Sequence, residues 1–179
     1  MKKPKLSKCT EEELWKYVGY HLAKAGIESV LVGGAVVAVY SQGAYRSGDL
    51  DFVSGAGMRP KIQSVLESLG FESIHSRHFE HPDCPHLSIE FPPGPVSIGD
   101  DHHIKPAEVK IGGRILKILS PTDCIRDRLV SYIHFNAREC LDQAVLVAKS
   151  QPFDLETVRK WCLSEGAKEA FDGFLEKIK

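Results

Sequence analysis

Apolar residues near the N-terminus recur at the spacing of one helix face. Thr10, followed three residues later by Glu13, forms a capping box, which is a common start signal of a helix. The apolar face that follows consists of Leu14, Tyr17, Val18, Leu22 and Ala25. Because the pattern stops at Gly26, it predicts an amphipathic helix between Thr10 and this glycine.

A short strand and a second helix follow, joined by a pair of glycines. Residues 28–32 form a β-branched run that stops at Gly33-Gly34, and residues 35–40 are apolar. This order predicts a strand, a glycine turn and a helix. Residues 49–53 then alternate acidic and apolar side chains, which predicts another strand.

The middle of the chain adds one helix, two strands and a hairpin. The predicted helix face consists of Met58, Ile62, Val65, Leu66 and Leu69, and the helix is closed by Gly70. Residues 71–79 and 87–91 read as two further strands, separated by a loop that contains histidines and prolines. Residues 109–118, interrupted by two glycines, predict a hairpin.

Three helices with clear start signals close the chain, and no strand lies between them. Ser120 supplies a cap and Pro121 takes the first helical position. Asn136 opens the second predicted helix and Asp154 the third. These patterns predict an α+β fold, in which a mixed β-sheet of about four to six strands is flanked by helices and followed by a C-terminal helical bundle.

Length and composition agree with this architecture. A chain of 179 residues fits one compact domain, or a small α/β unit with a helical appendage. We expect an α/β core over residues 1–118 and a helical C-terminal subdomain over residues 119–179, packed on the core. The formal net charge of −1 does not indicate that the chain as a whole binds nucleic acid or an anionic membrane.

The N-terminus and the cysteines indicate a cytoplasmic protein. The basic run of Lys2, Lys3, Lys5 and Lys8 is not followed by an apolar segment, so we expect neither a signal peptide nor a membrane anchor. The five cysteines are an odd number and include no C-x-x-C pair, so we expect reduced thiols.

Three acidic residues are candidates for metal binding. Asp49 and Asp51 lie two apart on the predicted strand, so their carboxylates point to the same side, roughly 6 to 7 Å apart by backbone rise. Like charges in line repel unless a cation or solvent compensates them. Glu90, from the predicted strand 87–91, adds a third carboxylate. Because these are hard oxygen ligands, we expect Mg²⁺ or Mn²⁺ on Asp49, Asp51 and Glu90.

The glycine turn is a candidate phosphate site. At Gly33 and Gly34, backbone amides can receive phosphate oxygens without a side chain in the way. Arg46 and Ser47, just before the aspartates, are further candidates for phosphate or hydroxyl contacts. Phosphoryl and nucleotidyl transfer require such metals and phosphate contacts, so the combination favours a nucleoside triphosphate as ligand.

These motifs resemble the nucleotidyltransferase superfamily, particularly its AbiEii-like branch, which includes toxins of abortive-infection systems. Residues 32–35 through 46–52 resemble the Gly-Gly motif of that branch and its Asp-x-Asp strand. Residues 118–129 and 138–142 are similar to its helical C-terminal motifs. The resemblance covers residues 28–149.

The resemblance implies an activity and roles for the motif residues. A nucleoside monophosphate would pass from a triphosphate to an acceptor hydroxyl, with the triphosphate on Gly33 and Gly34 and the metal on Asp49 and Asp51. Glu90 would be the third acid and assist deprotonation of the hydroxyl. The acceptor stays open among RNA, a protein and a small molecule, and a toxin–antitoxin system would add a partner protein.

The sequence departs from the resembling family at two places. Arg126 and Arg128 stand on a helix that often offers lysine, and Gly34 stands where many polymerase-like members have serine. The two arginines can still bind nucleotide phosphates, even bidentately, but cannot act as a titrating amine. The alternative for both is an exposed helix face.

Other interpretations of the candidate residues stay open. An isolated Asp-x-Asp is often a solvated edge strand, and the domain could be a catalytically inactive nucleotidyltransferase fold with a binding or regulatory role. The strongest rival is a zinc-stabilised interaction domain, because imidazole and thiolate at short spacings suit zinc. Its candidate ligands are His75, His78, His81, Cys84 and His86, which could also line a substrate cleft.

Overall fold

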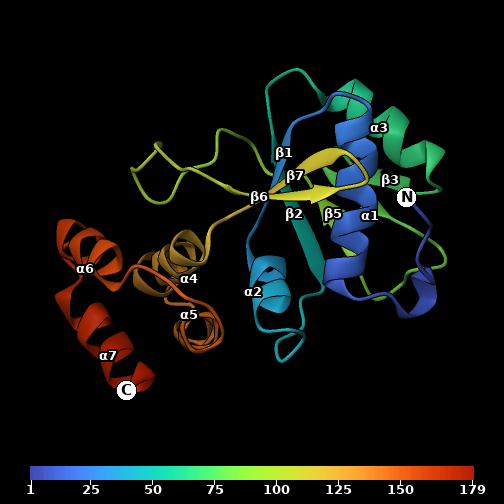
Figure 1. The fold of residues 1–179 in the computed structure, drawn as a ribbon. Helices are drawn as coiled ribbons and strands as arrows, with labels where there is room; N and C mark the ends of the chain where they lie inside the picture. Colours follow the sequence, from blue (N-terminus) through green and yellow to red (C-terminus); the bar gives the residue numbers. More distant parts are fainter.

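The computed structural model describes residues 1–179 and contains one seven-stranded mixed sheet with a group of helices beside it (Figure 1). The strand order is β3-β4-β5-β2-β1-β7-β6. The strands are β1 (Ser29–Val32), β2 (Asp49–Ser54), β3 (Glu72–His75), β4 (His78–Glu80), β5 (Ser88–Glu90), β6 (Ala107–Ile111) and β7 (Arg114–Ile118). The mixed sheet and the β6–β7 hairpin confirm the prediction, and the strand number exceeds the expected four to six.

Three helices pack on the sheet region: α1 (Glu11–Lys24), α2 (Gly34–Tyr40) and α3 (Arg59–Ser68). The predicted capping box starts α1, with the Glu13 amide donating to Thr10 Oγ1 at 3.2 Å and the Thr10 amide donating to Glu13 Oε2 at 2.9 Å. Gly26 follows the helix with φ of 71°. A short 3₁₀ helix, η1 (Leu6–Lys8), precedes α1.

The predicted strand, glycine turn and helix are confirmed at β1 and α2. Gly33 caps α2 with φ of 74° and ψ of −154°, a conformation that only glycine adopts readily. The chain can therefore pass from the strand into the helix without an intervening loop. Ala35, Val36 and Val37 are fully buried, so α2 is held by the core behind the turn.

Strand β2 lies in the middle of the sheet, between β1 and β5. It pairs antiparallel with β1 and parallel with β5. Leu50 and Phe52 are buried in the core, and successive side chains of a strand point to opposite faces. Asp49 and Asp51 therefore lie together on the other face of the sheet, where both are half-buried.

The prediction of one strand over residues 71–79 is wrong. This segment forms two antiparallel strands, β3 and β4, with His75 paired to His78 and a turn at Ser76-Arg77. The four residues of β3 are all exposed, so no burial favours a continued extended strand there. The extra hairpin strand raises the strand number to seven.

Helices α4 (Pro121–Phe135), α5 (Glu139–Ser150) and α6 (Leu155–Ser164) occupy the predicted C-terminal region. The predicted starts at Ser120 and Asp154 are confirmed, because these side chains accept bonds from the amides of Asp123 and Thr157. The predicted start at Asn136 is wrong. Asn136 instead ends α4 in a left-handed conformation with φ of 53°, which asparagine tolerates better than most residues.

A fourth C-terminal helix, α7 (Lys168–Ile178), was not predicted. Its N-cap, Ala167, forms no side-chain capping bond, so the usual start signal is missing. Packing explains the helix, since Phe171 and Phe174 are buried and α7 contacts both α5 and α6.

The C-terminal helices are joined to the sheet region through α2. Both α4 and α5 contact α2. The Tyr40 hydroxyl donates to the Leu119 carbonyl at 2.6 Å, and Gln151 Nε2 donates to the Tyr40 carbonyl at 2.9 Å. A single cluster of 38 buried apolar residues runs from Leu6 to Phe174. The division into subdomains at residue 118 stays a prediction.

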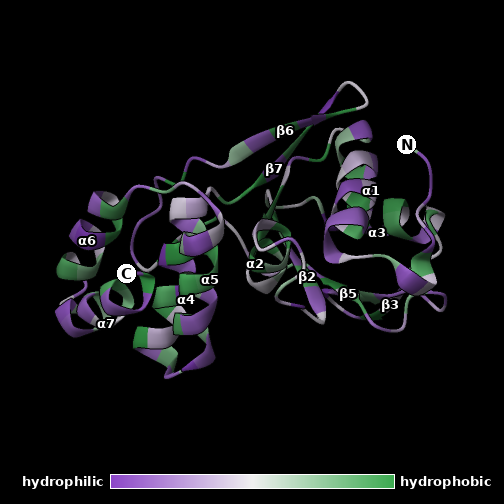
Figure 2. Cartoon of the chain, turned by 60° about the horizontal axis from the view of Figure 1, so that its bottom comes forward, coloured by the Kyte–Doolittle hydropathy of each residue, from purple (hydrophilic) through white to green (hydrophobic).

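Each of the helices α4 to α7 contains both hydrophilic and hydrophobic residues (Figure 2). This distribution is typical of helices with one face in a protein core and one in water. None of the helices combines the length and apolar character needed to cross a membrane.

Candidate functional site

The three predicted acidic residues lie on adjacent strands. The parallel pairing of β2 with β5 puts Asp51 opposite Glu90 and Asp49 opposite Ser88. Neighbouring strands are only about 4.8 Å apart, so Asp51 has a carboxylate on its own strand and another on the next. All three acids are half-buried and can therefore be reached from solvent.

The glycine turn lies directly against this cluster. Val32 pairs with Asp51, and Gly33 follows at the end of β1. A Cβ built on Gly33 would lie 2.5 Å from Oδ2 of Asp51, closer than real Cβ contacts allow. The backbone of the turn and the carboxylate are thus in contact, and only glycine permits this approach.

Gly34 lies close to Ser47, and Ser47 in turn is bonded to Asp49. A Cβ on Gly34 would lie 2.9 Å from Ser47 Oγ, and this hydroxyl donates to Asp49 Oδ1 at 3.0 Å. The Tyr45 hydroxyl is also near Gly34, 3.4 Å from the same Cβ position. Sequence reasoning did not single out Tyr45, although its place two residues before Ser47 was a usable signal.

The negative charges of the cluster act on one another. The pKa of Asp51 is raised from 3.8 to about 7, first by burial and then by the charges of Asp49 and Glu90. Arg128 lowers this pKa, and the neighbouring carboxylate of Asp127 raises it. The positive charge nearby does not balance the carboxylates, so the cluster is suited to receive a cation.

Arg128, on α4, is the predicted arginine that acts on this cluster. Its side chain is 14% exposed, and Nε and Nη2 both donate to Asp127 Oδ2, at 3.1 and 2.6 Å. A further bond runs from Nη1 to Gln143 at 3.4 Å. The guanidinium is therefore held in place beside the carboxylates, and the alternative of a freely exposed arginine is wrong for this residue.

Arg126 is buried in a separate polar contact. Nη1 donates to Asp123 at 2.9 Å and Nη2 to Asp101 at 2.6 Å, while the guanidinium carbon lies 5.6 Å from the ring centre of Trp161. The side chain is 7% exposed, so the exposed alternative is wrong here too. Its bonds join α4 to the segment before β6, and none reaches the acidic cluster.

Arg46 and Ser47 are both bound to the start of α1. Arg46 Nε donates to the buried carboxylate of Glu11 at 3.0 Å, and the Ser47 amide donates to the same oxygen at 2.8 Å. Glu11 thus fixes the segment that leads into β2 and orients the Ser47 hydroxyl toward Asp49. More than half of the Arg46 side chain stays exposed.

The members of the histidine-rich group lie in different surroundings. His78 joins the acidic cluster, with Nδ1 at 2.8 Å from Glu90 Oε1 and Nε2 at 2.9 Å from Glu80 Oε1. His81 is buried at the edge of Phe71, and His75 is exposed. The remaining members, Cys84 and His86, lie beside Cys9. The predicted five-residue zinc group is therefore not one site.

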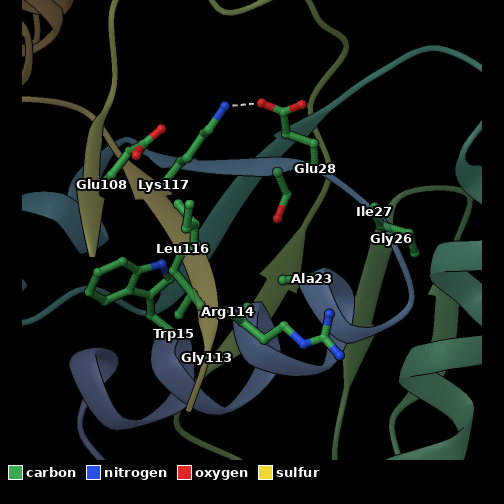
Figure 3. A pocket seen from close by; sticks show the side chains of 13 residues that line it. Trp15, Ala23, Gly26, Ile27, Glu28, Glu108, Gly113, Arg114, Leu116 and Lys117 are labelled. Carbon is green, nitrogen blue, oxygen red and sulfur yellow. Dashed lines mark hydrogen bonds and ion pairs between the residues drawn. The ribbon is translucent and has the colours of Figure 1, made fainter. Parts of the chain in front are cut away.

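A cavity of about 480 Å³ lies elsewhere, between α1 and β7 (Figure 3). Trp15 and Leu116 line it, and Lys117 points across to Glu28, with which it forms an ion pair. None of its lining residues belongs to the acidic cluster. We therefore take the half-exposed carboxylates beside the glycine turn as the candidate site.

The fold is similar to solved nucleotidyltransferase structures. A crystal structure of an antigenic nucleotidyltransferase-like protein from Paracoccidioides brasiliensis matches 76% of this chain and 74% of its own, with a TM-score of 0.57 and 14% identity. A crystal structure of ANT(2")-Ia in complex with adenylyl-2"-tobramycin matches 93% of this chain and 97% of its own, with a TM-score of 0.52 and 12% identity.

A solution structure of the antibiotic-resistance factor ANT(2'')-Ia matches 90% of this chain and 86% of its own, with a TM-score of 0.50 and 15% identity. No protein-family model matches the sequence, and no curated protein does. The chain therefore has a nucleotidyltransferase-like α+β fold, as predicted. At these identities the likeness concerns the fold alone.

Proposed function

We propose that this protein is a metal-dependent nucleotidyltransferase, which transfers a nucleoside monophosphate from a nucleoside triphosphate to an acceptor hydroxyl. The observation that supports the proposal is the pairing of Asp51 with Glu90 on adjacent strands, beside Gly33. This pairing would bring metal ligands and a backbone that can approach phosphate together at one site. The nucleotidyltransferase-like fold supports the same activity.

The residues fit a divalent cation. Asp49, Asp51 and Glu90 offer hard oxygen donors, which suit Mg²⁺ or Mn²⁺. The raised pKa of Asp51 comes partly from the other two carboxylates, a repulsion that a cation would relieve. When bound, the metal would neutralise the triphosphate and make the acceptor hydroxyl easier to deprotonate.

The chain's own groups would orient the nucleotide. The amides of Gly33 and Gly34 would bind phosphate oxygens, with Ser47 holding Asp49 and Arg128 adding positive charge. Of the other two predicted nucleotide contacts, Arg46 is more than half exposed and binds Glu11 only through Nε, so its other guanidinium nitrogens would be free for a phosphate. Arg126 would only stabilise the packing of α4, because its guanidinium is already bound to Asp101 and Asp123.

Glu90 would accept the proton of the acceptor hydroxyl. The hydroxyl oxygen then bonds to the α-phosphorus of the nucleotide, the bond to the bridging oxygen breaks, and pyrophosphate leaves. His78 bonds Glu90 Oε1 and would fix the orientation of this carboxylate. Its place on the neighbouring strand β4 makes it a positioning residue.

Two observations bear on the acceptor. The sequence motifs favour the AbiEii-like branch, and with it a toxin–antitoxin role and a partner protein. The structure of ANT(2")-Ia contains an adenylylated tobramycin, so a similar fold holds a small-molecule acceptor. RNA, protein and small-molecule hydroxyls therefore all belong in the set of acceptors to test.

The experiment is a calorimetric titration with each nucleoside triphosphate, with and without Mg²⁺. We expect metal-dependent binding in the wild type and its loss in Asp49→Asn/Asp51→Asn. Asp142→Asn/Asp172→Asn is the matched control, because it removes two charges from exposed helix positions. Unchanged binding in the first variant would overturn the proposal.

A second readout separates an enzyme from an inactive binding module. Pyrophosphate release is measured with the bound nucleotide and pools of RNA, protein and hydroxyl-bearing small molecules. Release that requires the two aspartates supports transfer, whereas binding without release from any pool supports a regulatory module.

A further inference from the structure

The segment before α1 lies against the loop between β4 and β5 and brings two thiols together. Cys9 and Cys84 are both 1% exposed, and their sulfurs are 3.7 Å apart. A ring nitrogen of His86 lies within 4.8 Å of both sulfurs. These ligand types, two thiolates and an imidazole, are those that zinc prefers.

The separation of the sulfurs matches a shared metal. Two thiolates bound tetrahedrally to zinc at about 2.3 Å each lie about 3.8 Å apart. The observed 3.7 Å therefore needs almost no movement. A disulfide would require the sulfurs to approach to about 2.0 Å.

The histidine already has the second contact that is typical of a metal ligand. His86 Nε2 lies 2.9 Å from the carbonyl oxygen of Cys9. A carbonyl oxygen only accepts hydrogen bonds, so Nε2 carries the proton and Nδ1 keeps its lone pair. Metal-bound histidines commonly donate their other ring N–H to a backbone carbonyl in this way.

The backbone on both sides of the pair is fixed. Cys9 Sγ donates to the Leu6 carbonyl at 3.3 Å in η1. The Cys84 amide donates to the His81 carbonyl at 2.8 Å, and prolines on both sides restrict the loop. The two thiols are therefore held near each other by elements that are far apart in sequence.

An open position is available on the solvent side. His86 is exposed although both thiols are buried. A cavity of about 350 Å³ borders Cys84 and His86 and is also lined by Glu72, Glu80 and His81. A fourth ligand, such as water, can reach a metal from this cavity.

We propose that Cys9 Sγ, Cys84 Sγ and His86 Nδ1 bind one Zn²⁺ ion, with water in the fourth position. Both thiols release a proton to solvent when the ion binds. The ion connects the N-terminal segment to the β4–β5 loop and stabilises the folded chain. Soft thiolates select zinc over Mg²⁺, so this site is distinct from the acidic cluster and does not depend on its activity.

The test is zinc and cobalt binding by the reduced full-length protein. The metal-free chain is titrated with Zn²⁺ against a chromophoric chelator, and with Co²⁺, whose thiolate charge-transfer absorption reports sulfur ligation. We expect one ion per chain and a higher melting temperature with zinc. Cys9→Ser and Cys84→Ser should each lose the cobalt–thiolate absorption and bind zinc at least tenfold more weakly.

Matched variants keep the test decisive. Cys140→Ser changes another buried cysteine, and His103→Ala changes another exposed histidine; both should bind zinc like the wild type. His86→Ala alters an exposed side chain and should fold, yet bind zinc at least tenfold more weakly. The proposal is overturned if the wild type binds no zinc, or if Cys9 and Cys84 are dispensable for binding.

Discussion

The Asp51 carboxylate packs against Gly33 and occupies the space that a side chain on this glycine would fill. A Cβ there would lie 2.5 Å from Asp51 Oδ2, and the positive φ of Gly33 also disfavours any other residue. The turn that would bind phosphate and a carboxylate that would bind metal thus depend on the same glycine.

Gly33→Ala should therefore damage the candidate site as well as the fold. We expect at least tenfold weaker binding of Mg²⁺–nucleotide, because the new methyl group displaces the Asp51 carboxylate. Backbone strain and the clash should lower the free energy of unfolding by about 2 to 4 kcal/mol. Urea unfolding and calorimetric titration measure the two effects.

Gly57→Ala is the control for this substitution. Gly57 has φ of 76°, but a Cβ there would meet nothing within 4 Å. It should cost about 1 kcal/mol through strain alone and leave nucleotide binding unchanged. Equal losses of binding in the two variants would show that the contact with Asp51 is unimportant.

The raised pKa of Asp51 predicts a specific pH dependence of stability. The carboxyl has a pKa of about 7 in the folded protein and 3.8 as its ordinary value. The folded state then binds more protons than the unfolded state between these values, so stability falls as pH rises from about 4 to about 7.

Asp51→Asn should remove this dependence. Measured in EDTA at pH 8, the variant should be more stable than the wild type by roughly 1 to 2 kcal/mol, since an uncompensated charge is gone. At pH 4 the difference should largely disappear. The idea fails if urea unfolding gives the same difference at both pH values, because a titrating Asp51 cannot produce that result.

Features that depend on neighbours in sequence could be predicted. The capping box at Thr10, the glycine turn at Gly33 and the cap at Ser120 are each encoded within a few residues, and each is present. The turn at Ser76-Arg77 has a serine but no glycine, proline or asparagine, so the division of β3 from β4 left only a weak local signal. Helix α7 likewise lacks a capping side chain.

Contacts between distant segments could be predicted only in part. The sequence placed the acidic residues Asp51 and Glu90 on two strands and suggested one shared metal, but only the pairing of β2 with β5 establishes that these strands are neighbours. The contact between Cys9 and Cys84 had no signal in the sequence, because the two residues are separated by 75 positions. Both are set by tertiary packing, which the spacing of residues along the chain does not specify.

Arg126 should matter for stability rather than for nucleotide binding. Arg126→Leu leaves Asp123 without its buried partner and removes the contact with Trp161, so we expect a loss of about 2 to 4 kcal/mol in urea unfolding. Arg159→Leu, at an exposed ion pair, should cost less than about 1 kcal/mol. If folded Arg126→Leu failed to bind nucleotide, a phosphate-binding role for this arginine would be the better explanation.

Glu90 should contribute to metal binding through its place beside Asp51. Glu90→Gln removes one charged oxygen ligand, so Mn²⁺ should bind about tenfold or more weakly, as measured by calorimetry or by electron paramagnetic resonance of the free ion. Glu80→Gln is a close control, because Glu80 bonds the same histidine, His78, and is largely exposed. If the effect came only from altering His78, both variants would weaken Mn²⁺ binding equally. A loss confined to Glu90→Gln identifies the pairing with Asp51 as the cause, since Glu80 pairs with Glu72 on the outer hairpin instead.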